Sequence, residues 1–343
     1  MKHPTHVIAR SVVRRSRTTR RSNLSSILKD CFVANSAPRN DMFLIALLIL
    51  VVVLAVACAT SPNSPSYTPA KYDTGVDTSA WATIPVGDFY FGQHEELTKV
   101  DYAFDMMVTL VTNKQYAEFL NKAIADGKIK IADGKVMTPY AGDKFIGRRH
   151  EKKILAGNYP MLTISNKDLR MTYDGTPARF AAKSAYENHP VVAVSWFGAK
   201  AFCEYHGWQL PTETEWEKAA RGTDKRAYPW GDEITLNNAN FYASQDPYEK
   251  MLGQQGDTTP VGFYNGKAYD GFQTVKSVSP YGLYDMAGNV WQWTGNLTEG
   301  MHYRYMRGGS HGTYEYNLRV WSRNAAEPDF VSPSVGFRCI RKK

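Results

Sequence analysis

The chain has 343 residues, of which 43% are hydrophobic and 13% aromatic, so it can bury a core in one large or two modest domains. Its formal charge of +8 is concentrated at one end, because residues 1–41 hold nine Lys or Arg against two acids, a balance of +7. Residues 42–343 keep 32 basic and 31 acidic side chains, a balance of +1. This balance argues against a nucleic-acid partner for the body of the protein.

An uncharged apolar run covers residues 43–57 and is followed at once by Cys58. It fits a signal-peptide core better than a membrane-spanning helix, which needs about 20 apolar residues. The small residues before Cys58 are similar to the cleavage site of bacterial lipoproteins. We therefore expect a lipoprotein signal peptide over 42–58, a lipid on Cys58 and a Pro/Ser/Thr-rich tether over 59–80. Residues 1–41 are then a basic leader or follow a misassigned start, and an uncleaved anchor is the alternative to cleavage.

This interpretation predicts an exported bacterial lipoprotein that is anchored to a membrane and lies in the periplasm or at the cell surface.

Two cysteines, Cys203 and Cys339, follow the leader. In an oxidising compartment such a pair is most simply a disulfide, which closes a loop of about 136 residues. A pair of metal-binding or redox cysteines is the competing interpretation, and no CxxC spacing or histidine partner favours it.

The first predicted elements lie after the tether. Alternating apolar and polar residues predict strands over 84–93 and 99–111. Helical spacing of apolar residues then predicts a helix with Thr112 as its N-cap and Gly127 as its stop. Residues 128–185 mix short strands with turns and are interpreted as an insertion in a domain that begins at residue 81 and runs to the end of the chain.

Three further elements follow the insertion. We expect a strand over 188–196 and a short helix over 197–207. Thr212 and Glu215 have the spacing of a capping box, and they predict a helix that ends at Gly222. Beyond this point the sequence is rich in Gly, Pro, Asn and aromatic residues, which is typical of loops wrapped on short strands.

Six motifs occur in a fixed order along the chain: "VTLVTNKQYAEFL", "HPVVAVSWFGAKAFCEYHGWQLPTETEWEKAARG", "YPWGDE", "YGLYDMAGNVWQWTGN", "MRGGS" and "VGFRC". Together they resemble the formylglycine-generating enzyme family, whose domains are also called sulfatase-modifying-factor domains. The resemblance implies an α+β fold of the C-type lectin kind, with little regular secondary structure, and a disulfide between Cys203 and Cys339. The family includes copper-using oxidases, iron enzymes of sulfur metabolism and ligand-binding proteins without known catalysis, so membership alone does not choose a function.

The resemblance places the two active-site cysteines of the copper-using oxidases at Glu315 and Val320. Because copper(I) selects thiolates, we expect no copper and no formylglycine generation by the copper route. The iron enzymes need clustered His and carboxylate ligands, whereas the eight histidines of this chain form no HxxxH or HExxH pair. Glu213, Glu215 and Glu217 begin a capped helix and are interpreted as structural. The sequence therefore predicts no catalytic residue.

The resemblance also implies calcium in the segment that contains "DMAGNVWQW". The ligands would be the Asp285 side chain, the backbone oxygens of Gly288 and Val290, and an acid at the place of Gln292. Calcium accepts carboxylate, amide and carbonyl oxygens alike. Gln292 offers an oxygen without a charge, so we expect a weaker site than in the family.

A second calcium site would use the side chain of Asn240 and the backbone oxygen of Phe241. Its acidic partner is left open between Asp257 and Asp270, because the sequence between these elements differs in length from the family.

Seven residues near the carboxy terminus have no evident structural role and are predicted to bind a ligand: His311, Thr313, Tyr314, Tyr316, Trp321, Asn324 and Phe330. Aromatic and amide side chains on loops provide contact area at a small entropic cost. The segment also resembles the randomised segment of variable proteins of diversity-generating retroelements, several of which are surface lipoproteins. An ordinary aromatic-lined pocket is the alternative interpretation.

The predicted function is therefore that of a lipid-anchored protein that binds an unidentified protein or small ligand through its carboxy-terminal loops. Its contact with the membrane is through the lipid. The alternative is a metal-dependent oxidase of the same family that acts on an exported substrate.

Overall fold

The computed structural model describes residues 69–144, 153–175, 177–248, 256–297 and 302–343. These residues belong to one unit, Tyr67–Lys343. The predicted leader, the signal peptide and Cys58 lie outside the described residues. Within the described ranges, no helix is both long enough and apolar enough to cross a membrane.

Three α-helices and one short 3-10 helix are described: α2 (Asn113–Ala125), α3 (Trp196–Tyr205), α4 (Glu213–Arg221) and η2 (Glu315–Leu318). The helices α2 and α4 begin where the sequence predicts, and α3 begins one residue earlier than predicted. In α2, the Thr112 hydroxyl accepts a hydrogen bond from the backbone N–H of Gln115, and in α4 the predicted capping box of Thr212 and Glu215 is present. Gly222 ends α4 with a φ of 78°, a conformation that glycine adopts without strain.

The strands are short: β1 (Trp81–Ile84), β2 (Gly87–Phe91), β3 (Glu96–Val100), β4 (Phe104–Met107), β5 (Lys130–Ala132), β6 (Lys135–Tyr140), β7 (Gly157–Thr163), β8 (Met171–Gly175), β9 (Ala178–Ala182), β10 (Ala268–Tyr269), β11 (Phe272–Gln273), β12 (Trp291–Leu297), β13 (Arg304–Arg307), β14 (Arg323–Ala326), β15 (Val335–Gly336) and β16 (Ile340–Lys342). Among them, a four-stranded sheet has the order β14-β13-β12-β15, and two three-stranded sheets have the orders β1-β4-β16 and β5-β6-β7. The other three pairs are the hairpins β2-β3, β8-β9 and β10-β11. This confirms the predicted α+β fold with short strands and few helices.

The prediction of a strand over 188–196 is wrong. Ala193 has a φ of 58°, which breaks an extended conformation. The backbone N–H groups of this segment also donate to three separate parts of the chain instead of one partner strand: Val191 to Val111, Ala193 to Ser332 and Ser195 to Met161. The segment is therefore a buried connection that leads from β9 to α3. Similarly, the strand expected over 99–111 is divided into the end of β3 and the separate strand β4.

The main core lies between α2, α3 and the four-stranded sheet. Trp291 and Trp293 both point into it from β12, which agrees with the alternation of an extended segment. The predicted disulfide between Cys203 and Cys339 is confirmed, with a Cα–Cα distance of 5.8 Å, and it joins α3 to the segment before β16. The predicted insertion is part of this core, because Val136, Met161 and other buried residues of β6 and β7 belong to it.

The folded domain begins before residue 81. The hydroxyl of Thr74 donates to the backbone oxygen of Val261 at 3.1 Å, and the Tyr72 ring lies 5.8 Å from that of Phe263. These contacts place the last part of the predicted tether against the domain surface.

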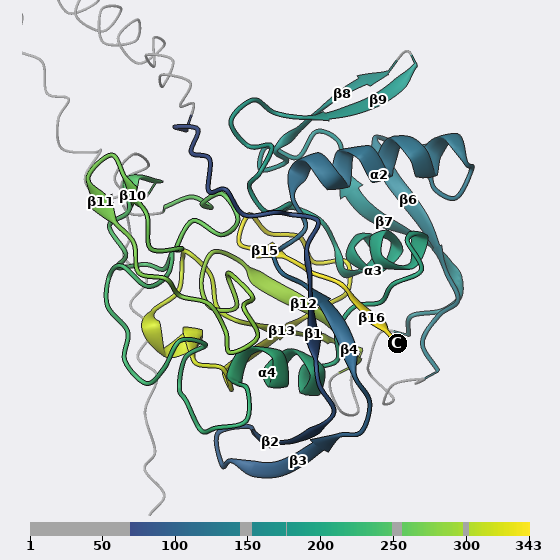
Figure 1. Cartoon of the computed structure of the whole chain (residues 1–343). Coiled ribbons are helices and arrows are strands. Elements are labelled where there is room, and N and C mark those ends of the chain that lie inside the picture. Colours follow the sequence, from purple (N-terminus) through teal and green to yellow (C-terminus); the bar gives the residue numbers. More distant parts are fainter. Residues whose placement is uncertain (1–68, 145–152, 176, 249–255, 298–301) are drawn as a thin grey trace, which may run out of the picture. The chain divides into compact units, whose positions relative to one another are not determined.

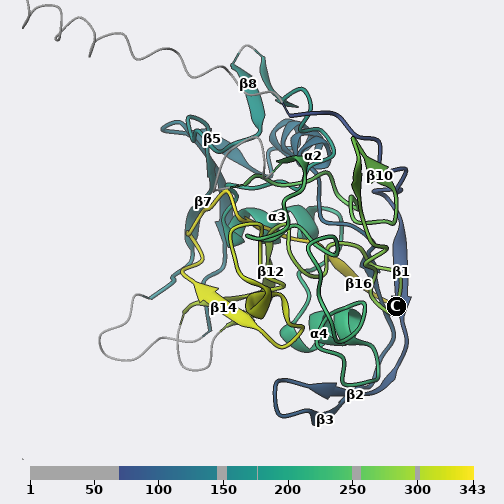
Figure 2. The same cartoon turned by 90° about the vertical axis from the view of Figure 1, so that its left-hand side faces the viewer.

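Figure 1 shows two hairpins at opposite ends of this unit: β8–β9 extends beyond α2, and β2–β3 lies beside α4. Figure 2, turned by 90°, again places β2–β3 against α4, with β14 and η2 near the same helix. The end of the chain lies in the sheet β1-β4-β16, where β16 pairs with β4. The arrangement brings the segment from η2 to β14 and the β2–β3 hairpin to the same side of α4.

Candidate functional site

A cavity of about 440 Å³ lies between the β2–β3 hairpin and the carboxy-terminal segment. This volume is in the range of small-molecule sites. The hairpin, α4, β13 and the segment from η2 to β14 provide its lining: Phe91, Gly92, Gln93, His94, Glu96, Glu217, Arg307, Tyr316, Asn317, Trp321, Ser322 and Arg323. The cavity thus combines residues from the two ends of the domain sequence.

The hairpin wall is held in place by α4. The backbone N–H of Gly92 donates to Oε1 of Glu217 at 2.7 Å, and Nη1 of Arg221 donates to the backbone oxygens of Tyr90 at 2.7 Å and Gly92 at 3.2 Å. Both α4 side chains are fully buried. Gly92 and Glu95, at the two ends of the turn, have positive φ values of 73° and 56°. The tip of the hairpin is therefore fixed by hydrogen bonds to buried charged groups.

Arg307 forms the floor of the cavity from β13. Its guanidinium donates to Glu213 at 2.7 Å, to Glu217, and to the backbone oxygen of Val320 at 2.6 Å. A buried ion pair with this many hydrogen bonds offsets much of the cost of removing its charges from water. The acids at the start of α4 are thus structural, as expected, and Glu217 also contributes to the cavity lining.

The opposite wall carries aromatic side chains and arginines. Tyr316 is 57% exposed, and the guanidinium of Arg319 lies 5.3 Å from its ring centre. Arg319 also lies 5.7 Å from the Trp321 ring, and Arg221 lies 5.2 Å from the same ring. These distances are within the range of cation–π attraction, which fixes the orientation of the Trp321 ring.

The structure divides the seven predicted ligand-binding residues into groups. Tyr316 and Trp321 line the cavity. Tyr314 is 60% exposed and packs against Tyr242, with ring centres 5.0 Å apart. Phe330, at 43% exposed, lies beyond β14.

The other three predicted residues make local contacts. Asn324 is exposed on β14, and its side-chain oxygen accepts from the backbone N–H of Ala325. Thr313 closes a turn, because its hydroxyl donates to the backbone oxygen of Ser310 at 2.9 Å. His311 is buried and its Nε2 lies 3.2 Å from Oγ of Ser334. Thr313 and His311 thus make contacts within the fold, and neither lines the cavity.

The hairpin side of the cavity, which includes Gln93, His94 and Glu96, was not predicted from the sequence. These residues lie more than 200 positions from Tyr316 in the sequence. No local pattern marks them, and only the anchoring of the hairpin on α4 brings them to the site.

The positions at which the copper-using oxidases have cysteines contain other side chains here. Glu315 is exposed at the start of η2, and Val320 is fully buried. The two cysteines in the described ranges, Cys203 and Cys339, are both in the disulfide. Those ranges also contain no group of three or more His, Cys, Asp or Glu arranged to hold a metal ion.

The first predicted calcium site does not fit a cation as its side chains are arranged. Oε1 of Gln292 accepts from Nε of Arg338 at 2.8 Å and from the indole N–H of Trp216 at 3.0 Å. Oδ2 of Asp285 accepts from the backbone N–H of Gly262 at 2.7 Å. Burial raises the pKa of Asp285 to about 6, against the opposing effect of Arg338, and this shift disfavours the charged form that calcium needs.

The second predicted calcium site retains one available oxygen. Oδ1 of Asn240 is buried and has no hydrogen-bond partner among the described residues. Its candidate acids are engaged: Asp257 accepts from Arg170 and from the Tyr186 hydroxyl, and Asp270 accepts from Tyr72. The donor set that calcium prefers is therefore incomplete here as well.

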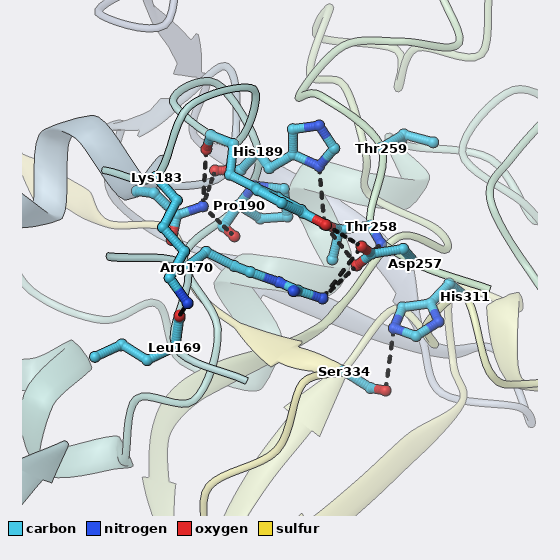
Figure 3. A network of polar contacts seen from close by, with 12 residues as sticks. Leu169, Arg170, Lys183, His189, Pro190, Asp257, Thr258, Thr259, His311 and Ser334 are labelled. Atoms are coloured by element: carbon cyan, nitrogen blue, oxygen red, sulfur yellow. Dashed lines mark hydrogen bonds and ion pairs between the residues drawn. The ribbon is translucent and has the colours of Figure 1, made fainter. Parts of the chain in front are cut away.

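Asp257 belongs to a buried polar network that joins the insertion to the carboxy-terminal half (Figure 3). Arg170 approaches the Asp257 carboxylate at 3.1 Å from the segment before β8, and Nδ1 of His189 lies 2.9 Å from Oγ1 of Thr258. Burial lowers the pKa of His189 to about 4, so it is neutral at physiological pH. The network connects two parts of the fold, and the lowered pKa of His189 makes this contact sensitive to acid.

The fold and the cavity define a lectin-like α+β domain with a cavity lined in part by aromatic side chains. Residues 68–343 match the sulfatase-modifying factor enzyme 1-like domain, and the chain belongs to this family. Its relatives include the inactive C-alpha-formylglycine-generating enzyme 2 of Mus musculus, 39% identical over 158 residues, which cover 44% of this chain and 48% of that protein. The formylglycine-generating enzyme of Thermomonospora curvata is 36% identical over 180 residues, which cover 44% of this chain and 55% of that protein.

The chain thus spans about half the length of the curated relatives it matches. Among solved structures, PvdO from Pseudomonas aeruginosa is similar over 81% of this chain and 100% of its own, with a TM-score of 0.50 and 21% identity. This likeness concerns the fold alone. The comparisons include both an enzyme and a relative named inactive, so the choice of function depends on the residues of this chain.

Proposed function

We propose that this chain is a ligand-binding protein that uses the cavity and the exposed aromatic side chains of its carboxy-terminal loops. The observation that carries the proposal is the exposure of large aromatic side chains in the carboxy-terminal part of the chain, where Tyr314 is 60% exposed, Tyr316 57% and Phe330 43%, and Tyr316 lines the cavity. Exposed aromatic side chains that are held by a rigid frame are typical of binding surfaces, because they bury a large area while few torsions become ordered.

Binding is favoured over copper-dependent oxidation by the chemistry of the site. Glu315 and Val320 provide no thiolate, and Cys203 and Cys339 are held in the disulfide. A metal-dependent oxidase remains the alternative within the family. Iron or copper at one equivalent per chain in the purified protein would favour the oxidase over the proposed function.

Export and lipid anchoring are part of the proposal. They are supported by the apolar run over 43–57, by Cys58 directly after it, and by the buried disulfide, which suits an oxidising compartment. Mass spectrometry of the protein from the membrane fraction tests them. A diacylglycerol adduct on Cys58 is the expected result, and an unmodified Cys58 in a soluble mature chain would contradict it.

Diversification of the carboxy-terminal segment is a narrower form of the same proposal. The exposed positions Tyr314, Tyr316, Asn324 and Phe330 are ones at which substitution alters the surface and leaves the core intact. Genome sequence tests it: a near-copy of the gene's last bases beside a reverse transcriptase, differing only at adenines, is the expected finding. Its absence would remove diversification and leave ligand binding in place.

Calcium stays a proposal for the place of Asn240, where a buried amide oxygen has no partner among the described residues. Calcium would there be held by Oδ1 of Asn240 and the backbone oxygen of Phe241. Calorimetric titration of calcium into chelator-treated protein tests this proposal. Binding that is lost in Asn240→Ala supports it, and the absence of binding contradicts it.

Saturation-transfer NMR with a fragment library tests the proposed function itself. Fragments are expected to bind the wild-type protein and to lose binding in Tyr316→Ala and Trp321→Ala. Leu97→Ala is the matched control, because Leu97 is 69% exposed on β3 and does not line the cavity. Thermal melts show that each variant is folded. Equal binding to the wild-type protein and to both aromatic variants would contradict the proposal.

A further inference from the structure

The cavity has unused hydrogen-bond donors. The indole N–H of Trp321 is buried and has no partner in the described part of the chain, although Trp321 lines the cavity. Four other indole N–H groups each have an acceptor: those of Trp196, Trp216, Trp230 and Trp293. A buried donor without an acceptor destabilises the structure, because it has lost its hydrogen bond to water. A ligand that brings an acceptor to Trp321 restores a hydrogen bond to this donor.

Arg307, on the floor of the cavity, also has a hydrogen-bond donor without an acceptor. Arg307 is 1% exposed, and its Nε has no hydrogen-bond partner among the described residues. Glu217, the buried acid of the lining, has both oxygens engaged, one by Gly92 and one by Arg307. The buried part of the lining therefore has two donors without acceptors, and both oxygens of its carboxylate are engaged.

The charges around the cavity also favour a ligand that accepts hydrogen bonds. Arg323 lines the cavity with its side chain 55% exposed and its Nη1 3.6 Å from Oε2 of Glu213, and Arg221 and Arg319 flank the Trp321 ring. Glu96 is the one exposed carboxylate of the described lining, and it belongs to the hairpin wall, opposite the carboxy-terminal wall of Trp321 and Arg323. The carboxy-terminal wall is thus cationic and rich in donors.

We propose that the cavity recognises a carboxylate attached to a planar apolar group. The carboxylate accepts hydrogen bonds from the indole N–H of Trp321 and from the guanidinium of Arg323, and the planar group lies against the Tyr316 ring. Arginine binds carboxylates with charge-assisted hydrogen bonds, which are about twice as strong as neutral ones. This inference rests on the proposed function and names the ligand class of the same site.

Calorimetric titration with three matched probes tests the inference: 4-hydroxyphenylacetate, its neutral amide 4-hydroxyphenylacetamide, and the cation tyramine. The carboxylate is expected to bind the wild-type protein about tenfold more tightly than either other probe, which corresponds to one charge-assisted hydrogen bond. Trp321→Phe removes the N–H and keeps an aromatic ring, and Arg323→Gln removes the charge. Each is expected to weaken carboxylate binding about tenfold.

Arg179→Gln is the matched control, since Arg179 is an exposed arginine on β9 outside the cavity lining, and it is expected to leave the affinity unchanged. Equal or tighter binding of the amide or of tyramine would overturn the carboxylate inference and leave the cavity as a binding site. No binding of the carboxylate up to about 10 mM would also overturn it. The fragment library judges the proposed function separately, because its outcome depends on Tyr316 and Trp321 and not on one ligand class.

Discussion

Arg338 donates its Nε–H to Oε1 of Gln292 at 2.8 Å, and both side chains are fully buried. The same oxygen accepts the indole N–H of Trp216 from α4, while Nε2 of Gln292 donates to the backbone oxygen of Asp285. One amide thus joins α4, β12, the loop before β12 and the carboxy-terminal segment. Burial lowers the pKa of Arg338 to about 10, and the guanidinium stays charged at neutral pH.

Replacement of this amide is expected to destabilise the domain strongly. Gln292→Leu keeps the side-chain size but leaves the donors of Arg338 and Trp216 without their shared acceptor, so the free energy of unfolding should fall by about 3 kcal/mol. Urea denaturation followed by fluorescence measures the change. Gln93→Leu, at an exposed position, is the control and should change it by less than about 0.5 kcal/mol. A similar small effect in Gln292→Leu would contradict the network.

Reduction of the disulfide is expected to lower stability by up to about 4–5 kcal/mol, because the bond between Cys203 and Cys339 closes a loop with a sequence separation of 136. The double variant Cys203→Ala/Cys339→Ala should unfold at the same urea concentration with and without reductant. The wild-type protein should shift toward the variant only when reductant is present. If reductant leaves the wild-type transition unchanged and mass spectrometry shows both thiols free, the prediction fails.

Stability at low pH is expected to depend on His189. Its pKa is about 4 in the folded protein, below its ordinary value of 6.5, because burial disfavours the imidazolium. Between these values the unfolded chain binds more protons, so the free energy of unfolding rises with pH from about 4 to about 6.5, by up to about 3 kcal/mol. His189→Phe keeps the ring contacts and should lose this slope. Urea titrations at several pH values measure it, and an unchanged slope in the variant would contradict the assignment.

Asp285 is expected to act in the opposite sense. Its pKa is raised from 3.8 to about 6 because burial disfavours the carboxylate. The folded protein therefore binds more protons between these values, and this contribution to stability, up to about 3 kcal/mol, is present below about pH 4 and is lost as the pH rises through 6. Asp285→Asn stays neutral and tolerates the positive φ of 53° at this position. The free energy of unfolding of the wild-type protein, relative to that of this variant, should fall between about pH 4 and pH 6. A difference that stays constant over this pH range would exclude the raised pKa of Asp285.

The parts of the fold that the sequence predicts are those specified by neighbouring residues. Thr112 and Thr212 mark helix starts because their hydroxyls cap N–H groups three residues ahead. The apolar segment before α3 reads as a strand, yet its hydrogen bonds go to three distant segments that no local pattern reveals. The strand-like composition of this segment predicts that it is buried, but it does not predict which strand, if any, pairs with it.

The site shows the same division. Tyr316 and Trp321 were identifiable because aromatic residues on a loop have no local structural purpose, and both line the cavity. Thr313 looks the same in sequence, but its hydroxyl closes a turn with Ser310. The hairpin wall was not identifiable, because Gly92 reaches the site only through its hydrogen bond to Glu217 in α4.

The central proposal is that this domain binds a ligand at its cavity and lacks the thiolate pair needed for copper-dependent oxidation. The most direct test is to incubate the purified protein with copper(I), air and a cysteine-containing sulfatase-type peptide, and to measure the peptide by mass spectrometry. With Glu315 and Val320 in place of the two thiolates, we expect the peptide thiol to remain unconverted. Formation of the aldehyde, above a control without protein, would contradict the account.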